Sequence, residues 1–221
     1  MKIGVATIGQ SPRPDVVGEI RRVLGQDIEI LEAGALDDLT LDEIQKIESK
    51  PGDGILVTRM RDGTEVKITH DFVVPLLQER ITELEGKGVN LILMLCTGRF
   101  PEFKAKSLIV MPSEIIRGVS RAALREGRLG TVLPSIQQIG GAPRERVNDG
   151  LVTYLDAASP YGPKEEIEEL GDRLAEQNLD LILLNCMGFD HAMKQIIKEK
   201  TGKPVIQASS LVARALKELI S

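Results

Sequence analysis

The sequence predicts an α/β protein with two similar doubly wound parallel-sheet lobes related by a pseudo-twofold axis. Two observations support this fold class. Short apolar runs alternate with helical patterns along the 221 residues, which favours parallel sheets connected through helices. The segment Leu91–Gly98 (LILMLCTG) also returns 90 residues later as Leu181–Gly188 (LILLNCMG), and the two copies contain the only two cysteines. A repeat of this kind indicates two lobes of similar construction.

The apolar runs predict the strands. They are too short for helices and are mostly apolar at both odd and even positions, which is typical of strands buried on both faces. The predicted strands are Lys2–Ile8, Ile28–Leu31, Ile55–Met60, Leu91–Leu95, Leu108–Met111, Leu129–Leu133, Leu151–Leu155, Leu181–Leu184 and Val205–Gln207.

Helical spacing of apolar residues predicts the helices between these strands. Pro163 suits the first position of a helix, Ser209 or Ser210 the cap of the last one, and Gly202 the end of the one before it. The apolar faces are Val16, Ile20, Val23 and Leu24; Val73, Leu77, Ile81 and Leu84; Ile167, Leu170 and Leu174; and Val212, Ala215, Leu216 and Leu219.

The repeat also includes the opening strand of each half. Lys2–Thr7 (KIGVAT) and Arg128–Leu133 (RLGTVL) lie 126 residues apart, and each leads into a loop that contains proline and serine. The first half is therefore about 36 residues longer, and its surplus includes RMRDGTEVKIT, where Asp62-Gly63 predicts a two-residue hairpin turn. The expected first lobe is 1–111 plus 208–221, with this hairpin as an insertion, and the second is 112–207.

Composition excludes several classes of function. The net charge is −5, from 28 basic and 33 acidic residues, whereas nucleic-acid binding needs a basic surface. No apolar run approaches the roughly 20 residues that span a bilayer. The N-terminal segment lacks a small-residue cleavage site, so no secretion signal is expected. Two distant cysteines do not resemble a disulfide framework, so reduced thiols and a cytoplasmic location are expected. A homo-oligomer is left open.

The two cysteines are the candidate catalytic residues. Ligands of parallel α/β sheets bind beyond the carboxyl ends of the strands, and Cys96 and Cys186 each end a predicted strand before a glycine. If the lobes pack around a pseudo-twofold axis, the thiols face each other across one cleft. A proton removed from one face of a substrate carbon and returned to the other inverts a stereocentre, which needs two acid/base groups. A thiol pKa of about 8.5 can be lowered by a helix N-terminus, and a helix start is expected after each cysteine. Simple core packing and a redox pair are the alternatives.

The residues around these strand ends are candidates for substrate binding. The backbone N–H groups of Gly9–Ser11 at a helix N-terminus, closed by Arg13, would form a cradle for an anion. The alternative is an ordinary capped turn at an exposed loop. Asn185 would donate to a substrate carboxylate or orient Cys186. The full set of candidates is Gly9, Gln10, Ser11, Arg13, Thr97, Gly98, Ser135, Asn185 and Gly188.

The other polar residues carry weaker predictions. His191 would be a base for Cys186, or more simply a solvated histidine in the first turn of a helix. His70 has no partner that the sequence identifies. Arg59 and Arg61 in the hairpin would reach a substrate or form a solvated arm. Neither a zinc motif nor a nucleotide-binding glycine motif is present, so no metal and no cofactor are expected.

These segments resemble a known group of proteins. The two-lobed plan with one cysteine ending a strand in each half is similar to the cofactor-independent aspartate/glutamate/hydantoin racemase superfamily. VATIGQSPRPD and LNCMGFD are more specifically similar to the AroM family within it. The resemblance covers essentially the whole chain. It implies small carboxylate substrates, without pyridoxal phosphate and without a metal.

The resemblance leaves the activity open between three expectations. Racemases of this group typically have Cys-Asn-Thr after the first strand and Cys-Thr after the second, where this chain has Cys96-Thr97-Gly98 and Cys186-Met187. We expect a cofactor-independent racemase or isomerase that acts on a small carboxylate. The alternatives are a single-cysteine isomerase or lyase, and a non-catalytic small-anion binding or regulatory protein with a racemase-like fold.

Overall fold

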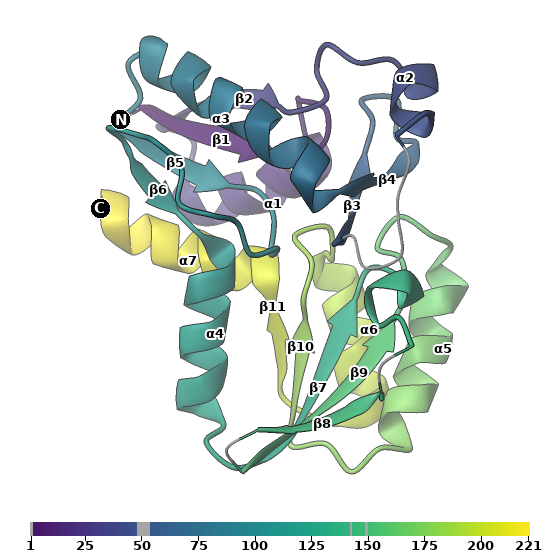
Figure 1. The fold of residues 1–221 in the computed structure, drawn as a ribbon. Coiled ribbons are helices and arrows are strands. Elements are labelled where there is room, and N and C mark those ends of the chain that lie inside the picture. Colours follow the sequence, from purple (N-terminus) through teal and green to yellow (C-terminus); the bar gives the residue numbers. More distant parts are fainter. Residues whose placement is uncertain (1, 48–53, 142, 149) are drawn as a thin grey trace. The chain divides into compact units, whose positions relative to one another are not determined.

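The computed structural model describes residues 2–47, 54–141, 143–148 and 150–221 (Figure 1). The chain divides into two compact units. Unit 1 comprises Met1–Ser113 together with Leu216–Ser221, and unit 2 comprises Glu114–Ala215. Within the described residues, no helix is both long and apolar enough to cross a membrane.

Unit 1 contains a four-stranded parallel sheet in the order β2-β1-β5-β6. Helix α1 (Pro14–Leu24) connects β1 to β2, and α3 (His70–Gly86) precedes β5. β2 and β5 lie on opposite sides of β1 in the sheet. Because parallel crossovers are right-handed, α1 and α3 therefore cover opposite faces of the sheet. Figure 1 shows α3 in front of the sheet and α1 behind it. The strands are β1 (Lys2–Thr7), β2 (Glu29–Gly34), β5 (Leu91–Met94) and β6 (Leu108–Val110).

Unit 1 also contains the predicted hairpin, formed by β3 (Ile55–Arg59) and β4 (Glu65–Thr69), and the short helix α2 (Leu41–Gln45). The hairpin is confirmed, but its turn has three residues rather than two. The N–H of Met60 donates to the carbonyl of Thr64 at 2.8 Å, and Gly63 has a φ of 96°. A three-residue loop places a left-handed residue last, and Gly63 supplies it.

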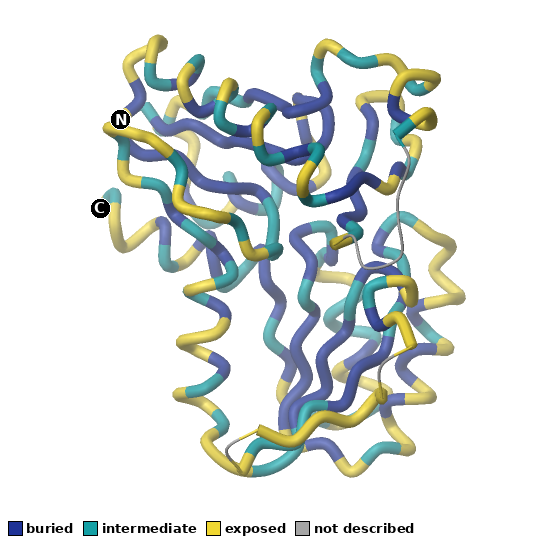
Figure 2. Tube along the Cα trace, in the orientation of Figure 1, coloured by how far each residue is buried: buried dark blue, intermediate teal, exposed yellow. Residues whose placement is uncertain are grey.

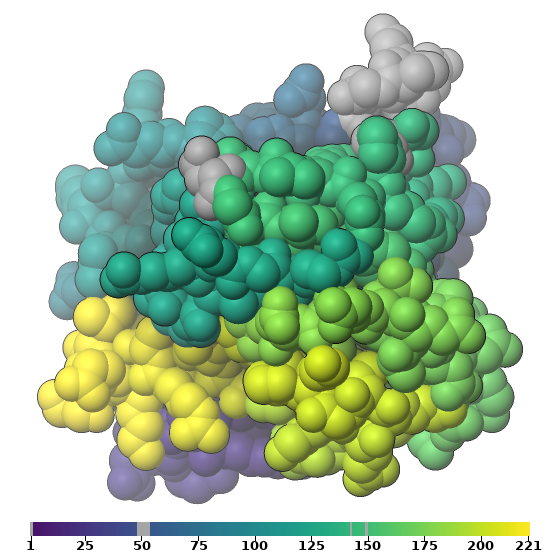
Figure 3. Space-filling model, turned by 90° about the horizontal axis from the view of Figure 1, so that it is seen from below, coloured from purple at the N-terminus to yellow at the C-terminus, as the bar shows by residue number. Residues whose placement is uncertain are grey.

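Unit 2 contains a five-stranded sheet in the order β11-β10-β7-β9-β8. Four strands are parallel, and β8 runs antiparallel at the edge, where Figure 2 shows it exposed. Seen from the side where the parallel strands begin, the teal, green and yellow-green segments form a continuous surface (Figure 3). Two helices belong to both units: α4 (Pro112–Ala123) begins in unit 1, and α7 (Ala208–Ile220) ends in it. The other elements of unit 2 are β7 (Gly127–Leu133), η1 (Ile136–Gln138), β8 (Glu145–Asn148), β9 (Leu151–Ala157), α5 (Lys164–Ala175), β10 (Leu181–Leu184), α6 (His191–Thr201) and β11 (Val205–Gln207).

The internal repeat extends to the pairing of the strands. In unit 1, Gly4 lies opposite Ile92 and Ala6 opposite Met94. In unit 2, Gly130 lies opposite Ile182 and Val132 opposite Leu184, at offsets of 126 and 90 residues. The outer strands agree in the same way, because β9 pairs with β7 as β2 pairs with β1, and β11 with β10 as β6 with β5. The predicted α/β class with parallel sheets in two similar halves is confirmed.

The apolar faces of the helices pack into the cores of the two units. Val73, Leu77, Ile81 and Leu84 of α3 are all completely buried, and so is Leu170 of α5. Gly202 ends α6 with a left-handed φ of 65°, as predicted. The predicted caps of the last helix are wrong, because α7 begins at Ala208 and both serines lie inside its first turn.

Candidate functional site

The carboxyl ends of the central strands collect the predicted site residues within each unit. In unit 1, β1 leads into Gly9–Arg13 and the neighbouring strand β5 leads into Cys96–Gly98. In unit 2, β7 leads into Ser135 and the neighbouring strand β10 leads into Asn185–Gly188. Each unit therefore places its candidates at the edge of the sheet where α/β proteins bind ligands.

The two cysteines have the same local geometry. The N–H of Gly98 donates to Cys96 Sγ at 3.3 Å, and the N–H of Gly188 donates to Cys186 Sγ at 3.4 Å. We call Cys96–Arg99 and Cys186–Phe189 the thiol turns. Cys96 is half-buried and Cys186 is 8% exposed. A hydrogen bond donated to sulfur stabilises the thiolate more than the thiol, and each turn gives its sulfur one such donor.

A glycine is needed in the second thiol turn. A Cβ at Gly188 would lie 2.7 Å from Tyr161 Oη and 2.9 Å from the Tyr161 ring. At Gly98 the nearest atoms to an added Cβ would be at 3.2 Å and 3.3 Å, on Leu56 and Phe100. The phenol of Tyr161 therefore packs directly against the turn that carries Cys186.

The predicted helix after Cys96 is wrong. Residues 95–107 contain no helix, and the chain passes directly to β6. After Cys186 the helix α6 begins five residues later, and the carboxylate of its cap, Asp190, accepts the N–H of Met193 at 2.8 Å. The local support for a thiolate is therefore the turn N–H and not a helix dipole.

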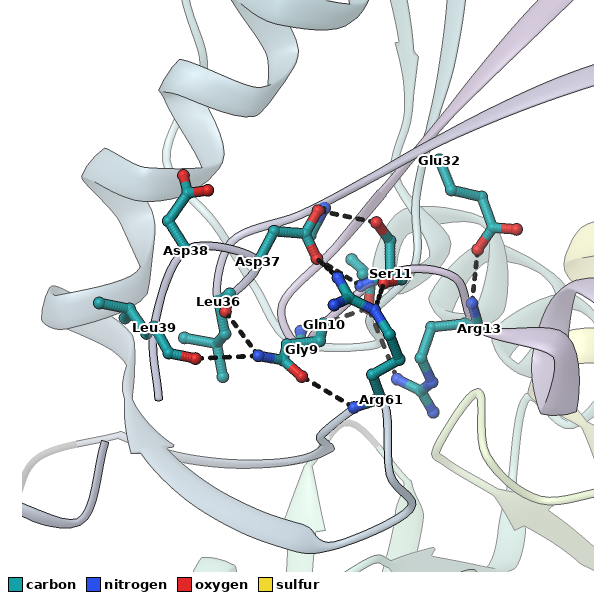
Figure 4. A network of polar contacts seen from close by, with 12 residues as sticks. Gly9, Gln10, Ser11, Arg13, Glu32, Leu36, Asp37, Asp38, Leu39 and Arg61 are labelled. Carbon is teal, nitrogen blue, oxygen red and sulfur yellow. Dashed lines mark hydrogen bonds and ion pairs between the residues drawn. The ribbon is translucent and has the colours of Figure 1, made fainter. Parts of the chain in front are cut away.

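The loop after β1 forms a closed polar network (Figure 4). Asp37 accepts the N–H of Ser11 at 2.6 Å, the hydroxyl of Ser11 at 2.7 Å and the N–H of Gly34 at 2.7 Å. The N–H of Gly9 donates to Thr7 Oγ1 at 3.3 Å, and that of Gln10 to the carbonyl of Arg59 at 3.1 Å. The expectation of an open anion cradle at Gly9–Ser11 is wrong, because all three N–H groups already have acceptors inside the protein.

The side chain of Gln10 connects this loop to two other segments. Its Nε2 donates to the carbonyls of Leu36 and Leu39 at 3.1 Å and 2.9 Å. Its Oε1 accepts the N–H of Arg61 at 2.9 Å. Arg61 in turn donates through Nε to the carbonyl of Ser11 at 2.6 Å. Gln10 and Arg61 therefore hold the hairpin to the loop, and Arg61 also pairs with Asp37 at 3.3 Å through a side chain that is 54% exposed.

Arg13 is buried, which differs from the exposed cation that the sequence predicts. It is 4% exposed, and its guanidinium donates to both carboxylate oxygens of Asp15 at 3.0 Å and 2.8 Å. Burial opposes the ionisation of Asp15, but the hydrogen bond and charge of Arg13, with the charge of Arg59 and the N–H of Val16, together outweigh it and lower the pKa of that carboxyl. The N–H of Arg13 donates to Glu32 at 2.6 Å. Burial raises the pKa of Glu32 despite this bond.

The remaining candidates have mixed surroundings. Ser135 accepts the N–H of Gln137 at 3.3 Å and caps η1. Thr97 and Asn185 flank the two thiols and are half-buried. His191 is exposed and lies 3.1 Å from Gln195 Nε2 on its own helix, which agrees with the simpler prediction for it. Across the described residues, no cluster of three or more His, Cys, Asp or Glu side chains is arranged to hold a metal.

Sequence reasoning missed the side chains that contact the thiol turns. His70 Nε2 lies 2.8 Å from the carbonyl oxygen of Arg99. In unit 2, the carbonyl of Phe189 accepts from Gln207 Nε2 at 2.9 Å and from Ser209 Oγ at 3.1 Å. No sequence signal identifies these contacts, because the acceptors are backbone carbonyls and the donors lie 18 to 29 residues away.

The fold is similar to those of solved racemases and isomerases. Glutamate racemase from Aquifex pyrophilus matches with a TM-score of 0.59 at 15% identity, over 100% of this chain and 84% of that one. Allantoin racemase from Klebsiella pneumoniae gives 0.57 at 15%, over 99% and 87%. Maleate isomerase from Pseudomonas putida S16 gives 0.58 at 12%, over 100% and 93%. Identities this low show the fold alone.

The sequence itself identifies the family. No curated protein matches it significantly. The family model described as AroM protein, however, matches residues 3–220. The resemblance inferred from the N-terminal loop and the second thiol turn is confirmed: the chain belongs to the AroM family.

Proposed function

We propose that this protein is a cofactor-independent racemase or isomerase that acts on a small carboxylate, with Cys96 and Cys186 as its acid/base pair. One observation carries the proposal. In each sheet, a cysteine follows the end of a central strand, and its sulfur accepts a hydrogen bond from the N–H of the glycine two residues further on. The N–Sγ distances are 3.3 Å at Cys96 and 3.4 Å at Cys186. Equivalent donors on both sulfurs favour two thiols that exchange roles between acid and base.

The chemistry needs only these two groups and the substrate. One cysteine, as thiolate, removes the proton from the carbon next to the carboxylate and becomes a thiol. The other, as thiol, returns a proton to the opposite face and becomes a thiolate. The number of protons is unchanged, and the reverse reaction exchanges the roles. Glutamate and maleate, named in the titles of two similar structures, support a small carboxylate as the substrate class.

Deuterium exchange tests this proposal. The intact protein is incubated in D2O with acidic amino acids and hydroxy acids, and deuterium is measured at the carbon next to the carboxylate. Cis-enedioates are incubated in parallel and scored for the trans isomer, which forms without loss of a carbon-bound proton. Exchange should fall by a factor of about 10² to 10⁴ in Cys96→Ala and in Cys186→Ala, the usual contribution of a positioned acid or base. Loss in only one variant would indicate a single-cysteine isomerase or lyase. Full activity in both variants would contradict the proposal.

A second candidate is a non-catalytic protein that binds a small anion. It is favoured by Met187, which is buried at the position where the racemases it resembles carry a threonine hydroxyl. Calorimetric titration with the same carboxylates distinguishes the two candidates. Tight binding without exchange of any substrate proton would select the binding protein.

A further inference from the structure

We propose that His70 in unit 1, and Gln207 with Ser209 in unit 2, are positioning residues that hold the two thiol turns by the same backbone carbonyl. Arg99 is the third residue after Cys96, and Phe189 is the third residue after Cys186. Any effect of these residues on catalysis rests on the proposed function, whereas their expected effect on the pKa of the two thiols does not.

In unit 1 the contact is made by the first residue of α3. His70 Nε2 lies 2.8 Å from the carbonyl oxygen of Arg99. A carbonyl oxygen only accepts hydrogen bonds, so Nε2 carries the proton. The imidazole also stacks on Phe100, the next residue, with ring centroids 5.3 Å apart and planes 18° apart. His70 therefore contacts the end of the thiol turn through both a hydrogen bond and a ring face.

In unit 2 two donors converge on the equivalent carbonyl. Gln207 ends β11 and Ser209 lies in the first turn of α7, and both donate to the carbonyl of Phe189. Gln207 is 2% exposed, and among the described residues its Oε1 has no donor. A buried acceptor without a partner destabilises a fold. The amide nitrogen donates to the carbonyl of Phe189 at 2.9 Å and to Ser209 Oγ at 2.8 Å, so these two acceptors orient the side chain.

The two units reach this contact with unrelated side chains. The position in unit 1 that matches Gln207 is Met111, because Val110 pairs with Leu93 as Ile206 pairs with Leu183. Methionine has no N–H to donate, and His70 enters from a different element. The carbonyl at the same position of each turn therefore accepts a hydrogen bond from a different side chain, His70 in unit 1 and Gln207 in unit 2. This agreement indicates that both turns need a donor at that carbonyl.

The requirement follows from the geometry of the turns. The N–H that donates to sulfur belongs to the residue immediately before the held carbonyl, Gly98 in one turn and Gly188 in the other. Holding the carbonyl restricts rotation of the turn and keeps this N–H directed at the sulfur. Without the hold, the thiolate loses part of its hydrogen bond. The apparent pKa of that thiol should then rise by about half a unit to one unit, a three- to tenfold loss of thiolate near pH 7.

The test measures each thiol separately in the full-length protein. The rate of alkylation by iodoacetamide is followed against pH, and mass spectrometry quantifies the peptides that contain Cys96 and Cys186. His70→Phe keeps an aromatic ring against Phe100 but removes the donor, whereas His70→Gln keeps an N–H donor. We expect His70→Phe to raise the apparent pKa of Cys96 and to leave Cys186 unchanged, and His70→Gln to restore most of the wild-type profile.

Gln207→Met provides the reciprocal control. It introduces the residue that unit 1 has at the matching position, and it should raise the apparent pKa of Cys186 and leave Cys96 unchanged. If thermal melting shows that this variant does not fold, Ser209→Ala removes the weaker of the two contacts and should give a smaller shift in the same direction.

Two results would overturn the proposal. One is an unchanged pH profile at the nearby thiol in a folded variant. The other is an equal shift at both thiols, which would show general loosening of the protein. The outcome is independent of turnover. A selective shift at each thiol, combined with full exchange activity in both cysteine-to-alanine variants, would keep the positioning role and reject the proposed function.

Discussion

Replacing Arg13 with methionine should destabilise the protein strongly, although Arg13 lies in a loop. The variant removes two charge-assisted hydrogen bonds at 3.0 Å and 2.8 Å and leaves the Asp15 carboxylate without its main partner. Breaking a fully buried ion pair costs about 3–5 kcal/mol. The side chain of Asp15 is 27% exposed, so water recovers part of this energy. We expect a loss of about 2–4 kcal/mol, which for a chain of this size lowers Tm by roughly 4–16 °C.

The loss should depend on pH in a defined direction. The pKa of Asp15 is below its ordinary value of 3.8 in the folded protein, because the hydrogen bond and charge of Arg13, with smaller contributions from Arg59 and the N–H of Val16, together outweigh the effect of burial. A carboxyl with a lowered pKa contributes stability above its unfolded pKa, and this stability is lost as the pH falls through the folded value. The difference between wild type and Arg13→Met should therefore be complete at pH 7 and should narrow below about pH 3.8.

Differential scanning calorimetry at pH 7 and pH 3 measures both effects. The matched control is Arg22→Met on α1, the helix that contains Asp15. Arg22 pairs with Glu19, and the Arg22 side chain is 74% exposed. Surface pairs of this kind contribute about 0–1 kcal/mol, so the control should change Tm little. Equal losses in the two variants, or a difference at pH 3 as large as at pH 7, would refute the reasoning.

Two further predictions concern stability. Gly9→Ala should destabilise the protein by several kcal/mol, because its Cβ would lie 2.3 Å from a threonine hydroxyl and 2.5 Å from a backbone oxygen. Gly18→Ala has open space around the added Cβ and should stabilise the protein by about 0.5–1 kcal/mol. Urea unfolding measures the free energy of unfolding of both variants. Asp156→Asn weakens contacts to Arg144 and Arg173, and should cost about 1–3 kcal/mol at pH 7 and less below pH 3.8, as measured by calorimetry.

The fold could be predicted because its strands are buried on both faces. Runs such as Leu91–Leu95 and Leu181–Leu184 have the continuous apolar pattern that strands buried on both faces require. The strand β8 was missed because all of Glu145–Asn148 is exposed and carries no such pattern. The hairpin was predicted but its turn length was not, since a glycine in the left-handed region suits both a two-residue and a three-residue turn.

The site was only partly predictable. The thiols and their glycines follow from the repeat, and the structure adds that each glycine N–H donates to its sulfur. Arg13 was placed at the surface because a sequence does not show that Asp15, two residues away, would pair with it in a buried loop. The contacts of His70 and Gln207 with the thiol turns have no sequence signal for a related reason: a backbone carbonyl has no signature in the sequence.

The matching strand pairings bear on how this chain arose. A slip of one residue turns every side chain of a strand to the opposite face, so independent sheets rarely agree pair by pair. Such agreement is expected of two halves that derive from one segment by duplication and fusion. Loops accept insertions at small entropic cost. Between β2 and β5 the first half is 33 residues longer than the second, since Gly34 matches Ala157 at an offset of 123 while Leu91 matches Leu181 at 90. This longer stretch contains the hairpin, and its strand β4 runs directly into His70, which contacts the carbonyl of Arg99.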